Sequence, residues 1–213
     1  MSGNFPLWVF CCRHVRTVKI HRMPQNDYPL TLLCHPATPA PVVRAIEASV
    51  LLRADGGLTL AFRVWGDMAR LLIPMTGASE RTELLWEHTC FEIFVAGAGD
   101  SAYREFNFSP CGPWAAYAFS DYRQRDETLV LSEAPQIASR LFAGRLEIEA
   151  LLAPGGLPAY AGRLQIGLAA VIEAADVVDG SHSYWALHHP ALRPDFHHRE
   201  AFTLELSGPR NSV

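Results

Sequence analysis

Two glutamates and an asparagine lie among aromatic residues near the middle of the chain, at Glu92, Glu105 and Asn107. Successive side chains of a β-strand point to opposite faces, so Glu105 and Asn107 share one face of their segment. A buried carboxylate is costly unless it is paired or hydrogen-bonded. Two arrangements fit these residues. Either they accept hydrogen bonds from ligand hydroxyl groups in an aromatic pocket, or the glutamates pair with arginines such as Arg104 or Arg123 on a solvated face.

The segment that follows predicts room for a ligand. Trp114, Ala116 and Ala118 share one face of a strand over residues 114–119. The two alanines are small at positions where a sheet normally carries bulk. They therefore indicate the floor of a shallow pocket, with Trp114 as one wall.

Two carboxyl groups also suit a glycosidase, which holds them about 5–5.5 Å apart for retention or about 6.5–9.5 Å apart for inversion. Glu92 and Glu105 are the pair that this chemistry would use. No nucleophile elbow, phosphate loop or cofactor fingerprint accompanies them. Non-catalytic binding is therefore the prediction, and a glycosidase-like enzyme is an alternative.

A second polar set precedes the last predicted strand, and it comprises His182, His188, His189, Asp195, His197 and His198. Imidazole and carboxylate groups can bind a metal. Adjacent strand residues point apart, however, so only one histidine of each neighbouring pair could join such a site, and no metal site is predicted. One histidine, with Met68 or Met75, could instead ligate haem. The third interpretation is a rigid loop, bounded by prolines, in which these side chains hydrogen-bond to backbone groups.

Short segments of period two, joined by Gly, Pro and Asp turns, position these residues. Strands are predicted over 42–53, 58–65, 90–95, 103–108, 114–119, 129–132, 139–142, 145–151, 163–172, 183–187 and 201–206. Prolines predict an extended edge or loop over 28–41, and charged residues predict a turn over 124–128. No convincing long amphipathic helix is found. This pattern is typical of an all-β sandwich.

Composition narrows the function classes. The 213 residues are 49% apolar and carry a net charge of −4, without a basic run, which excludes nucleic acid as a partner. The 5 cysteines show no CxxC spacing, so neither a disulfide framework nor a zinc site is expected. We predict that residues 1–27 are a disordered extension, or alternatively that the true start is Met23, and that residues 208–213 are a tail. Without a signal or a membrane-spanning segment, we expect a cytoplasmic protein that does not bind membranes.

Several ordered motifs resemble one family. They are Trp86-x-x-Thr89-Cys-Phe-Glu-Ile-Phe94, Tyr103-x-Glu105-Phe-Asn-Phe-Ser-Pro110, Trp114-Ala-Ala-Tyr-x-Phe119 with Tyr122-Arg123, Tyr184-Trp-Ala-Leu187 and Pro194-Asp-Phe-His197. The chain resembles, over residues 28–207, the DOMON-like family, which is related to the family 9 carbohydrate-binding modules. Its closing motifs are similar to those of bacterial members found beside a MurB-type reductase. The resemblance implies a two-sheet antiparallel β-sandwich of jelly-roll type that binds a sugar or haem without catalysis.

The leading hypothesis is a binding module for a carbohydrate or a similar polyhydroxylated molecule. The residues expected to accept, donate or stack in its site are Glu92, Glu105, Asn107, Trp114, Arg123, Trp185, His188, Asp195 and His197. No cofactor is required, although haem bound through one histidine is the first alternative. A protein partner on the same surface is a further one.

Overall fold

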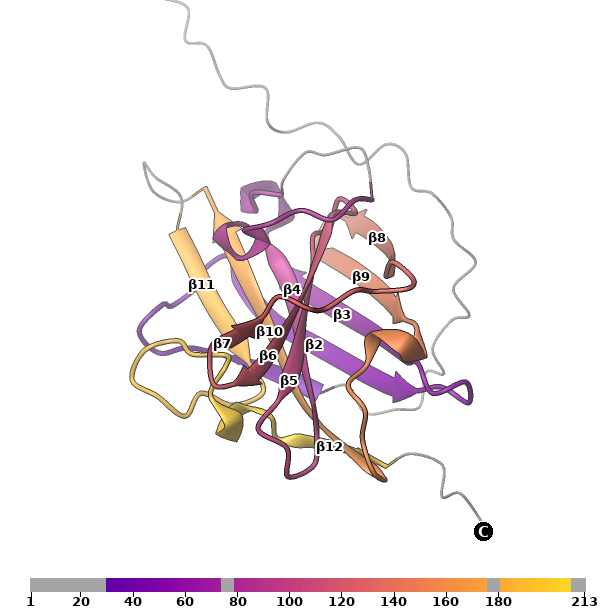
Figure 1. Cartoon of the computed structure of the whole chain (residues 1–213). Helices are drawn as coiled ribbons and strands as arrows, with labels where there is room; N and C mark the ends of the chain where they lie inside the picture. Colours follow the sequence, from indigo (N-terminus) through magenta and orange to yellow (C-terminus); the bar gives the residue numbers. More distant parts are fainter. Residues whose placement is uncertain (1–29, 74–78, 176–180, 208–213) are drawn as a thin grey trace, which may run out of the picture.

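Antiparallel β-strands make up most of the regular structure in the computed structural model, which describes residues 30–73, 79–175 and 181–207 (Figure 1). Within these residues the strands are β1 (Leu30–Cys34), β2 (Val43–Leu52), β3 (Leu58–Gly66), β4 (Cys90–Gly97), β5 (Tyr103–Phe108), β6 (Trp114–Asp121), β7 (Gln124–Asp126), β8 (Gln136–Phe142), β9 (Arg145–Leu152), β10 (Arg163–Ala174), β11 (Ser181–Ala186) and β12 (Leu204–Ser207). The short 3₁₀ helices are η1 (Met68–Arg70), η2 (Leu85–Glu87), η3 (Pro154–Gly156) and η4 (Arg199–Ala201). The predicted all-β class is therefore confirmed.

The strands form two sheets, and β1 belongs to both. The first sheet has the order β7-β6-β5-β4-β10-β11, with β12 also paired to β10, and the second has the order β1-β2-β3-β9-β8. Leu33 and Cys34 lie opposite β11, whereas residues 30–32 lie opposite β2. A strand that passes from one sheet to the other forms a corner of a sandwich. The antiparallel two-sheet sandwich expected from the sequence is confirmed.

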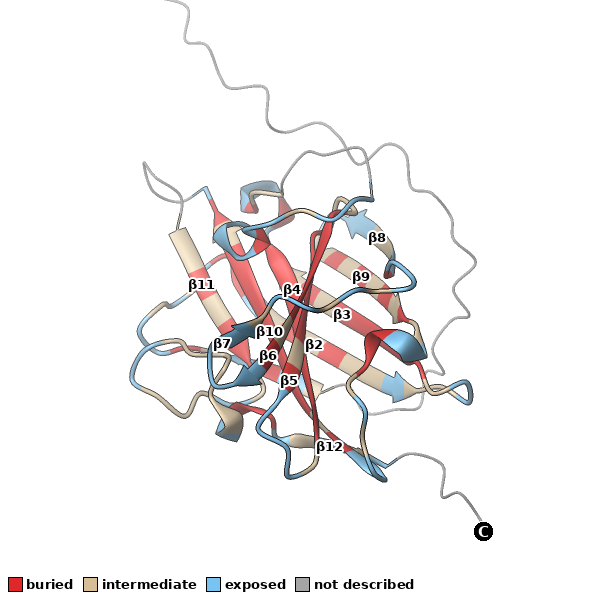
Figure 2. Ribbon diagram, viewed as in Figure 1, coloured by how far each residue is buried: buried red, intermediate tan, exposed pale blue. Residues whose placement is uncertain are grey.

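The main core lies between the two sheets. Phe91 and Ile93 of β4 and Phe106 of β5 point into it, and they meet residues such as Phe62 and Ile148 of the second sheet. The rings of Phe62 and Phe91 are 5.1 Å apart. Figure 2 shows that buried residues concentrate on the middle strands of the first sheet. Every residue of β4 is buried, so the other face of this sheet must also be covered.

Two segments cover the outer face of the first sheet: residues 79–89, which contain η2, and residues 187–203, which contain η4. Phe202 of the second segment packs directly on β10, because a Cβ at Gly167 would lie 3.0 Å from its ring. Phe94 of β4 contacts the same ring, with centroids 5.6 Å apart. The outer face therefore carries a second apolar cluster under two covering segments.

Several segments differ from their sequence-based predictions, among them 201–206, where only residues 204–206 lie in a strand, β12. Residues 129–132 are not a strand, and 124–128, predicted as a turn, contain β7. The true turn precedes β7 and uses Arg123 at φ 55°, a left-handed conformation that usually indicates glycine or asparagine. Residues 28–41 were expected to be an edge or loop, yet β1 is paired on both sides.

The predicted extension over residues 1–27 and the tail over 208–213 lie outside the described residues. In the part of the chain that the structure describes, no helix is both long and apolar enough for a membrane span.

Candidate ligand-binding site

A cavity of about 400 Å³ opens on the outer face of the first sheet, beside the segment 187–203. Its lining consists of Trp86, Glu92, Phe94, Glu105, Tyr117, Phe119, Arg123, Arg125, Val171, Tyr184, Pro194, Phe196 and His197. Strands β4, β5, β6, β10 and β11 supply the base of this pocket, and the loops supply its walls. The pocket therefore depends on long-range pairing of strands that are distant in the sequence.

One row of residues crosses the sheet beneath the pocket, in the order Ala115, Asn107, Glu92, Ala169 and Ala186. Three of these five residues are alanines, so Glu92 and Asn107 have no bulky side chain beside them in the row. The sequence predicted such small residues, but at Ala116 and Ala118. That prediction was wrong because Ala116 lies on the other face of β6, in the core between the sheets.

The carboxyl group of Glu105 is buried, with 5% of the residue exposed. Asn107 Nδ2 donates a hydrogen bond of 2.8 Å to its Oε1, and His197 Nε2 lies 3.7 Å from its Oε2. Burial raises the pKa of Glu105 to about 7, although the hydrogen bond from Asn107 and the positive charges of Arg123 and Arg125 oppose this.

Glu92 is more isolated. Only 3% of the residue is exposed, and the Cys90 thiol donates to its Oε1 over 3.2 Å. Burial and the nearby Glu105 raise the pKa of Glu92 to about 8. A solvated face with arginine pairs is therefore wrong for both glutamates. Arg104 instead donates to backbone carbonyl oxygens of residues 155 and 157.

His197 is held as a neutral imidazole. Burial and the adjacent Arg123 lower the pKa of His197 to about 4, so the ring carries no charge near pH 7. The backbone N–H of Arg123 donates to the Tyr103 hydroxyl, which lies 2.8 Å from His197 Nδ1. The hydroxyl accepts from Arg123 and is therefore free to donate to Nδ1. We assign the proton of the ring to Nε2, which faces Glu105 and the pocket.

The Tyr103→Phe substitution is expected to lower the free energy of unfolding by about 1–3 kcal/mol, since it removes two partly buried hydrogen bonds, to the Arg123 N–H and to His197 Nδ1. Urea unfolding measures this loss. Tyr160→Phe is the matched control, since the hydroxyl of Tyr160 has no hydrogen bond within the described residues. Equal effects of the two substitutions would contradict the described role of the Tyr103 hydroxyl.

Asp195 holds Arg123 in place. Arg123 Nη2 lies 2.9 Å from Asp195 Oδ1, and the Tyr122 hydroxyl donates to Oδ2 over 2.7 Å. The backbone N–H of His197 also donates to Asp195. Burial would raise the pKa of Asp195, but these hydrogen bonds and the Arg123 charge outweigh it, and the pKa is lowered. Asp195 therefore remains a carboxylate that positions two lining residues.

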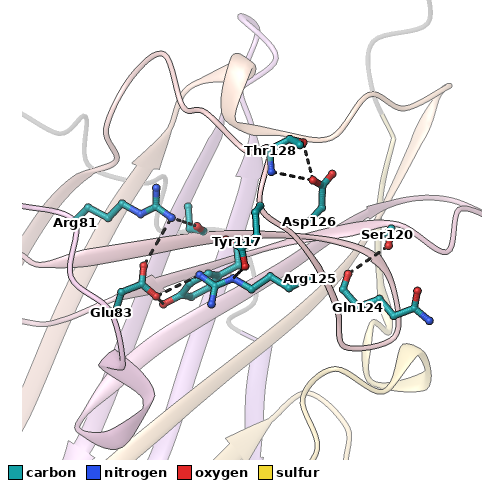
Figure 3. A network of polar contacts seen from close by, with 10 residues as sticks. Arg81, Glu83, Tyr117, Ser120, Gln124, Arg125, Asp126 and Thr128 are labelled. Atoms are coloured by element: carbon teal, nitrogen blue, oxygen red, sulfur yellow. Dashed lines mark hydrogen bonds and ion pairs between the residues drawn. The ribbon is translucent and has the colours of Figure 1, made fainter.

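A second polar network includes the lining residues Tyr117 and Arg125 (Figure 3). The Tyr117 hydroxyl donates to Glu83 Oε2 over 2.9 Å, and Arg125 lies 3.3 Å from the same oxygen. The guanidinium of Arg125 also stacks 4.3 Å from the Tyr117 ring. Trp86 contacts that ring edge-on, with centroids 5.9 Å apart. Tyr117 and Trp86 therefore present aromatic surface to the pocket, and the Tyr117 hydroxyl is already bonded to Glu83.

The nine predicted site residues divide into three groups. Glu92, Glu105, Arg123 and His197 line the pocket. Asn107 and Asp195 bond to lining residues from behind. The remaining three lie elsewhere: Trp114 and Trp185 are buried in the core between the sheets, and His188 is exposed on the loop. A stacking role for the two tryptophans does not fit this arrangement.

Four further lining residues were not predicted from the sequence: Tyr117, Arg125, Tyr184 and Phe196. One signal for Tyr117 was present, since alternation puts it on the face of β6 away from Trp114. What was missing was the register, which places Tyr117 directly opposite Glu105.

The other histidines mostly bond to the backbone, as the loop interpretation predicted. His182 Nε2 lies 2.8 Å from the Glu87 carbonyl oxygen, and His189 Nε2 lies 2.8 Å from that of Leu33. His198 accepts from a backbone N–H at the start of η4. In the described part of the chain, no three His, Cys, Asp or Glu side chains form a group suited to a metal ion. Haem binding stays an untested alternative.

Comparison with known proteins supports the fold. No protein-family model and no curated protein matches the sequence. The structure is similar to that of a proposed carbohydrate-binding protein from Bacteroides uniformis, with 17% identity, a TM-score of 0.60 and 84% of each chain covered. It is also similar to a family 9 carbohydrate-binding module from Caldicellulosiruptor kristjanssonii, solved with glucose, with 10% identity, a TM-score of 0.51, and 84% of this chain and 89% of that chain covered. These similarities establish a sandwich fold like that of the family 9 modules. Membership of the DOMON-like family stays a prediction.

Proposed function

We propose that this chain is a non-catalytic module that binds a carbohydrate, or a similar polyhydroxylated small molecule, in the described pocket. The observation that carries the proposal is the set of fixed polar groups between aromatic surfaces: Glu105, Arg123 and His197 among rings such as those of Tyr117 and Phe196. Sugars match this lining, because their C–H faces pack on rings while their hydroxyl groups bond to fixed polar atoms. The fold similarity to a module solved with glucose supports the same choice.

Each of these polar groups is positioned before a ligand arrives. Asn107 holds Glu105, Asp195 holds Arg123, and Tyr103 holds His197. Preorganised groups lose little conformational entropy on binding, so more of their interaction energy contributes to affinity.

The pKa values of the two carboxyl groups also fit ligand binding better than glycoside hydrolysis. A retaining enzyme needs one protonated acid and one carboxylate that stays ionised, and their environments push the two pKa values apart. Burial here raises the pKa of both Glu92 and Glu105. Neither environment favours a persistent carboxylate nucleophile.

The Glu105→Gln substitution is expected to weaken sugar binding about tenfold at pH 8, because a charged acceptor makes a stronger hydrogen bond than an amide. A thermal-shift screen of mono- and oligosaccharides selects the ligand, since a molecule that binds only the folded state raises its melting temperature. Isothermal titration calorimetry then measures the affinity.

Glu205→Gln is the matched control, since Glu205 is exposed on β12 and pairs with Arg163 far from the pocket lining. Equal affinities of the two variants would count against the proposed site. A screen in which no sugar raises the melting temperature would count against the function. A Soret band on haem titration that disappears in His197→Ala would support the haem alternative instead.

A further inference from the structure

The pocket contains more acidic groups than basic groups. Within the described residues, the charged groups of its lining and of the ion pairs at its rim are Arg81, Arg123, Arg125, Glu83, Glu92, Glu105, Glu127 and Asp195. The three arginines pair with Glu83, Glu127 and Asp195, with N–O distances from 2.9 to 3.8 Å. The two carboxyl groups left over are those of Glu92 and Glu105, which are also the two most buried.

Glu105 has partial compensation, and Glu92 has almost none. Glu105 receives the hydrogen bond from Asn107, faces His197 and feels the charges of two arginines. Glu92 receives only the weak bond from the Cys90 thiol. In the described part of the chain, no arginine, lysine or histidine nitrogen lies within 4.0 Å of Glu92. A carboxylate taken out of water in this way lacks the counter-ion that normally repays its desolvation.

The titratable groups around Glu92 come from every neighbouring element. They are Cys90 on its own strand, Glu105 from β5, Tyr184 from β11, His197 from the covering loop, and Arg123 and Arg125 from the turn and strand after β6. Of these, the neutral His197 and the acidic groups cannot neutralise Glu92. The two arginines are already paired with other carboxylates.

The walls of the pocket would favour a positively charged group of a ligand. Rings from Trp86, Phe94, Tyr117, Tyr184 and Phe196 line the same cavity as Glu92. An ammonium group is attracted to aromatic faces, and its three N–H donors match a carboxylate and neighbouring acceptors. A positively charged group of the ligand would therefore find both a counter-ion and a favourable aromatic surface.

We propose that the pocket selects a sugar or similar polyol that carries a protonated primary amine, and that this ammonium group binds at Glu92. The inference rests on the proposed function and adds the chemical class of the ligand. Neutral hydroxyl groups would be bound by Glu105, Arg123 and His197, while the amine would compensate the buried carboxylate. An N-acetylated sugar would lack this advantage, because its amide carries no charge.

The test compares matched sets of sugars on the full chain by isothermal titration calorimetry at about pH 6.5. Each set contains a neutral hexose, its 2-amino form and its 2-acetamido form: glucose, galactose and mannose with their derivatives. In at least one set we expect the amino sugar to bind at least tenfold more tightly than the other two. Glu92→Gln is expected to bring this ratio close to one, whereas Glu205→Gln retains it.

Proton release provides a second measurement that does not depend on the folding of a variant. The ammonium group replaces the proton that Glu92 holds, so binding of the amino sugar to the wild-type chain is expected to release protons, detected as a heat that varies with the buffer. Neutral hexose binding should release fewer protons, because its hydroxyl groups favour ionisation of Glu105 alone.

Each outcome decides the proposal. Equal affinities for amino and neutral sugars would overturn the amine inference and leave the proposed function standing. An unchanged ratio in Glu92→Gln, or amino-sugar binding that releases no more protons than neutral hexose binding, would overturn the assignment to Glu92. Failure of every sugar to bind would overturn both proposals.

Discussion

Replacing Glu92 with glutamine is expected to raise the free energy of unfolding near pH 8 by on the order of 3 kcal/mol, and to change it little near pH 4. Burial and Glu105 raise the pKa of Glu92 from its ordinary value of 4.5 to about 8. The folded protein therefore holds this proton more tightly than the unfolded chain does. The stability contributed by the protonated group is complete below pH 4.5 and is lost as the pH rises toward 8. Glutamine cannot ionise, so the variant avoids this loss.

Urea unfolding of the wild type and of Glu92→Gln at pH 4, 6 and 8 measures the effect. Part of the pH dependence will persist in the variant, because burial also raises the pKa of Glu105. The exposed control Glu205→Gln should follow the wild type at each pH. Parallel curves for wild type and Glu92→Gln would show that Glu92 is not buried as described.

Most strands could be predicted from the sequence because each has an alternating or wholly apolar pattern bounded by turn residues. The prediction for residues 42–53 differs from β2 by one residue at each end, and that for 58–65 differs from β3 only at its end. The Asp55-Gly56 turn between them is explicit in the sequence, with Gly56 at φ 86°. These local sequence signals are sufficient to predict the fold class.

Two strands could not be predicted from the sequence, for different reasons. β1 lies in a proline-rich segment, and it is a strand because its backbone pairs with β2 on one side and with β11 on the other. β7 has three residues, with no alternation long enough to detect, and depends on the turn at Arg123. For β1, long-range hydrogen bonding outweighs local propensity, whereas β7 pairs locally with β6 through a hairpin turn.

The candidate site was predictable in part for a similar reason. Alternation correctly put Glu105 and Asn107 on one face of β5, and the aromatic residues around these acceptors indicated a pocket. Alternation cannot tell which face of one strand joins which face of the next, and this depends on the register. In the observed register Tyr117 lies opposite Glu105, while Trp114 lies on the other face of β6. The loop residues Pro194 and Phe196 reach the pocket only through tertiary folding.

Alternation likewise could not predict that Trp185 lies in the core. Its replacement is the second substitution with a large expected effect on stability. The Trp185→Ala substitution is expected to lower the free energy of unfolding by about 3–5 kcal/mol, as removal of a buried indole from a core does. Only 5% of Trp185 is exposed, and its Nε1 donates to Ser183 Oγ over 3.0 Å. It lies opposite Cys34 of β1, so the cavity would open where the two sheets join.

Trp86→Ala is the informative counterpart, because Trp86 is 38% exposed and lines the pocket. We expect it to change stability by less than about 1 kcal/mol while weakening sugar binding severalfold, through loss of ring contact. Urea unfolding and calorimetric titration of both variants, at a temperature where each is folded, separate the two effects. If folded Trp185→Ala lost sugar affinity while Trp86→Ala kept it, the stacking role that the sequence suggested for Trp185 would be restored, and the pocket described here would not be the sugar site.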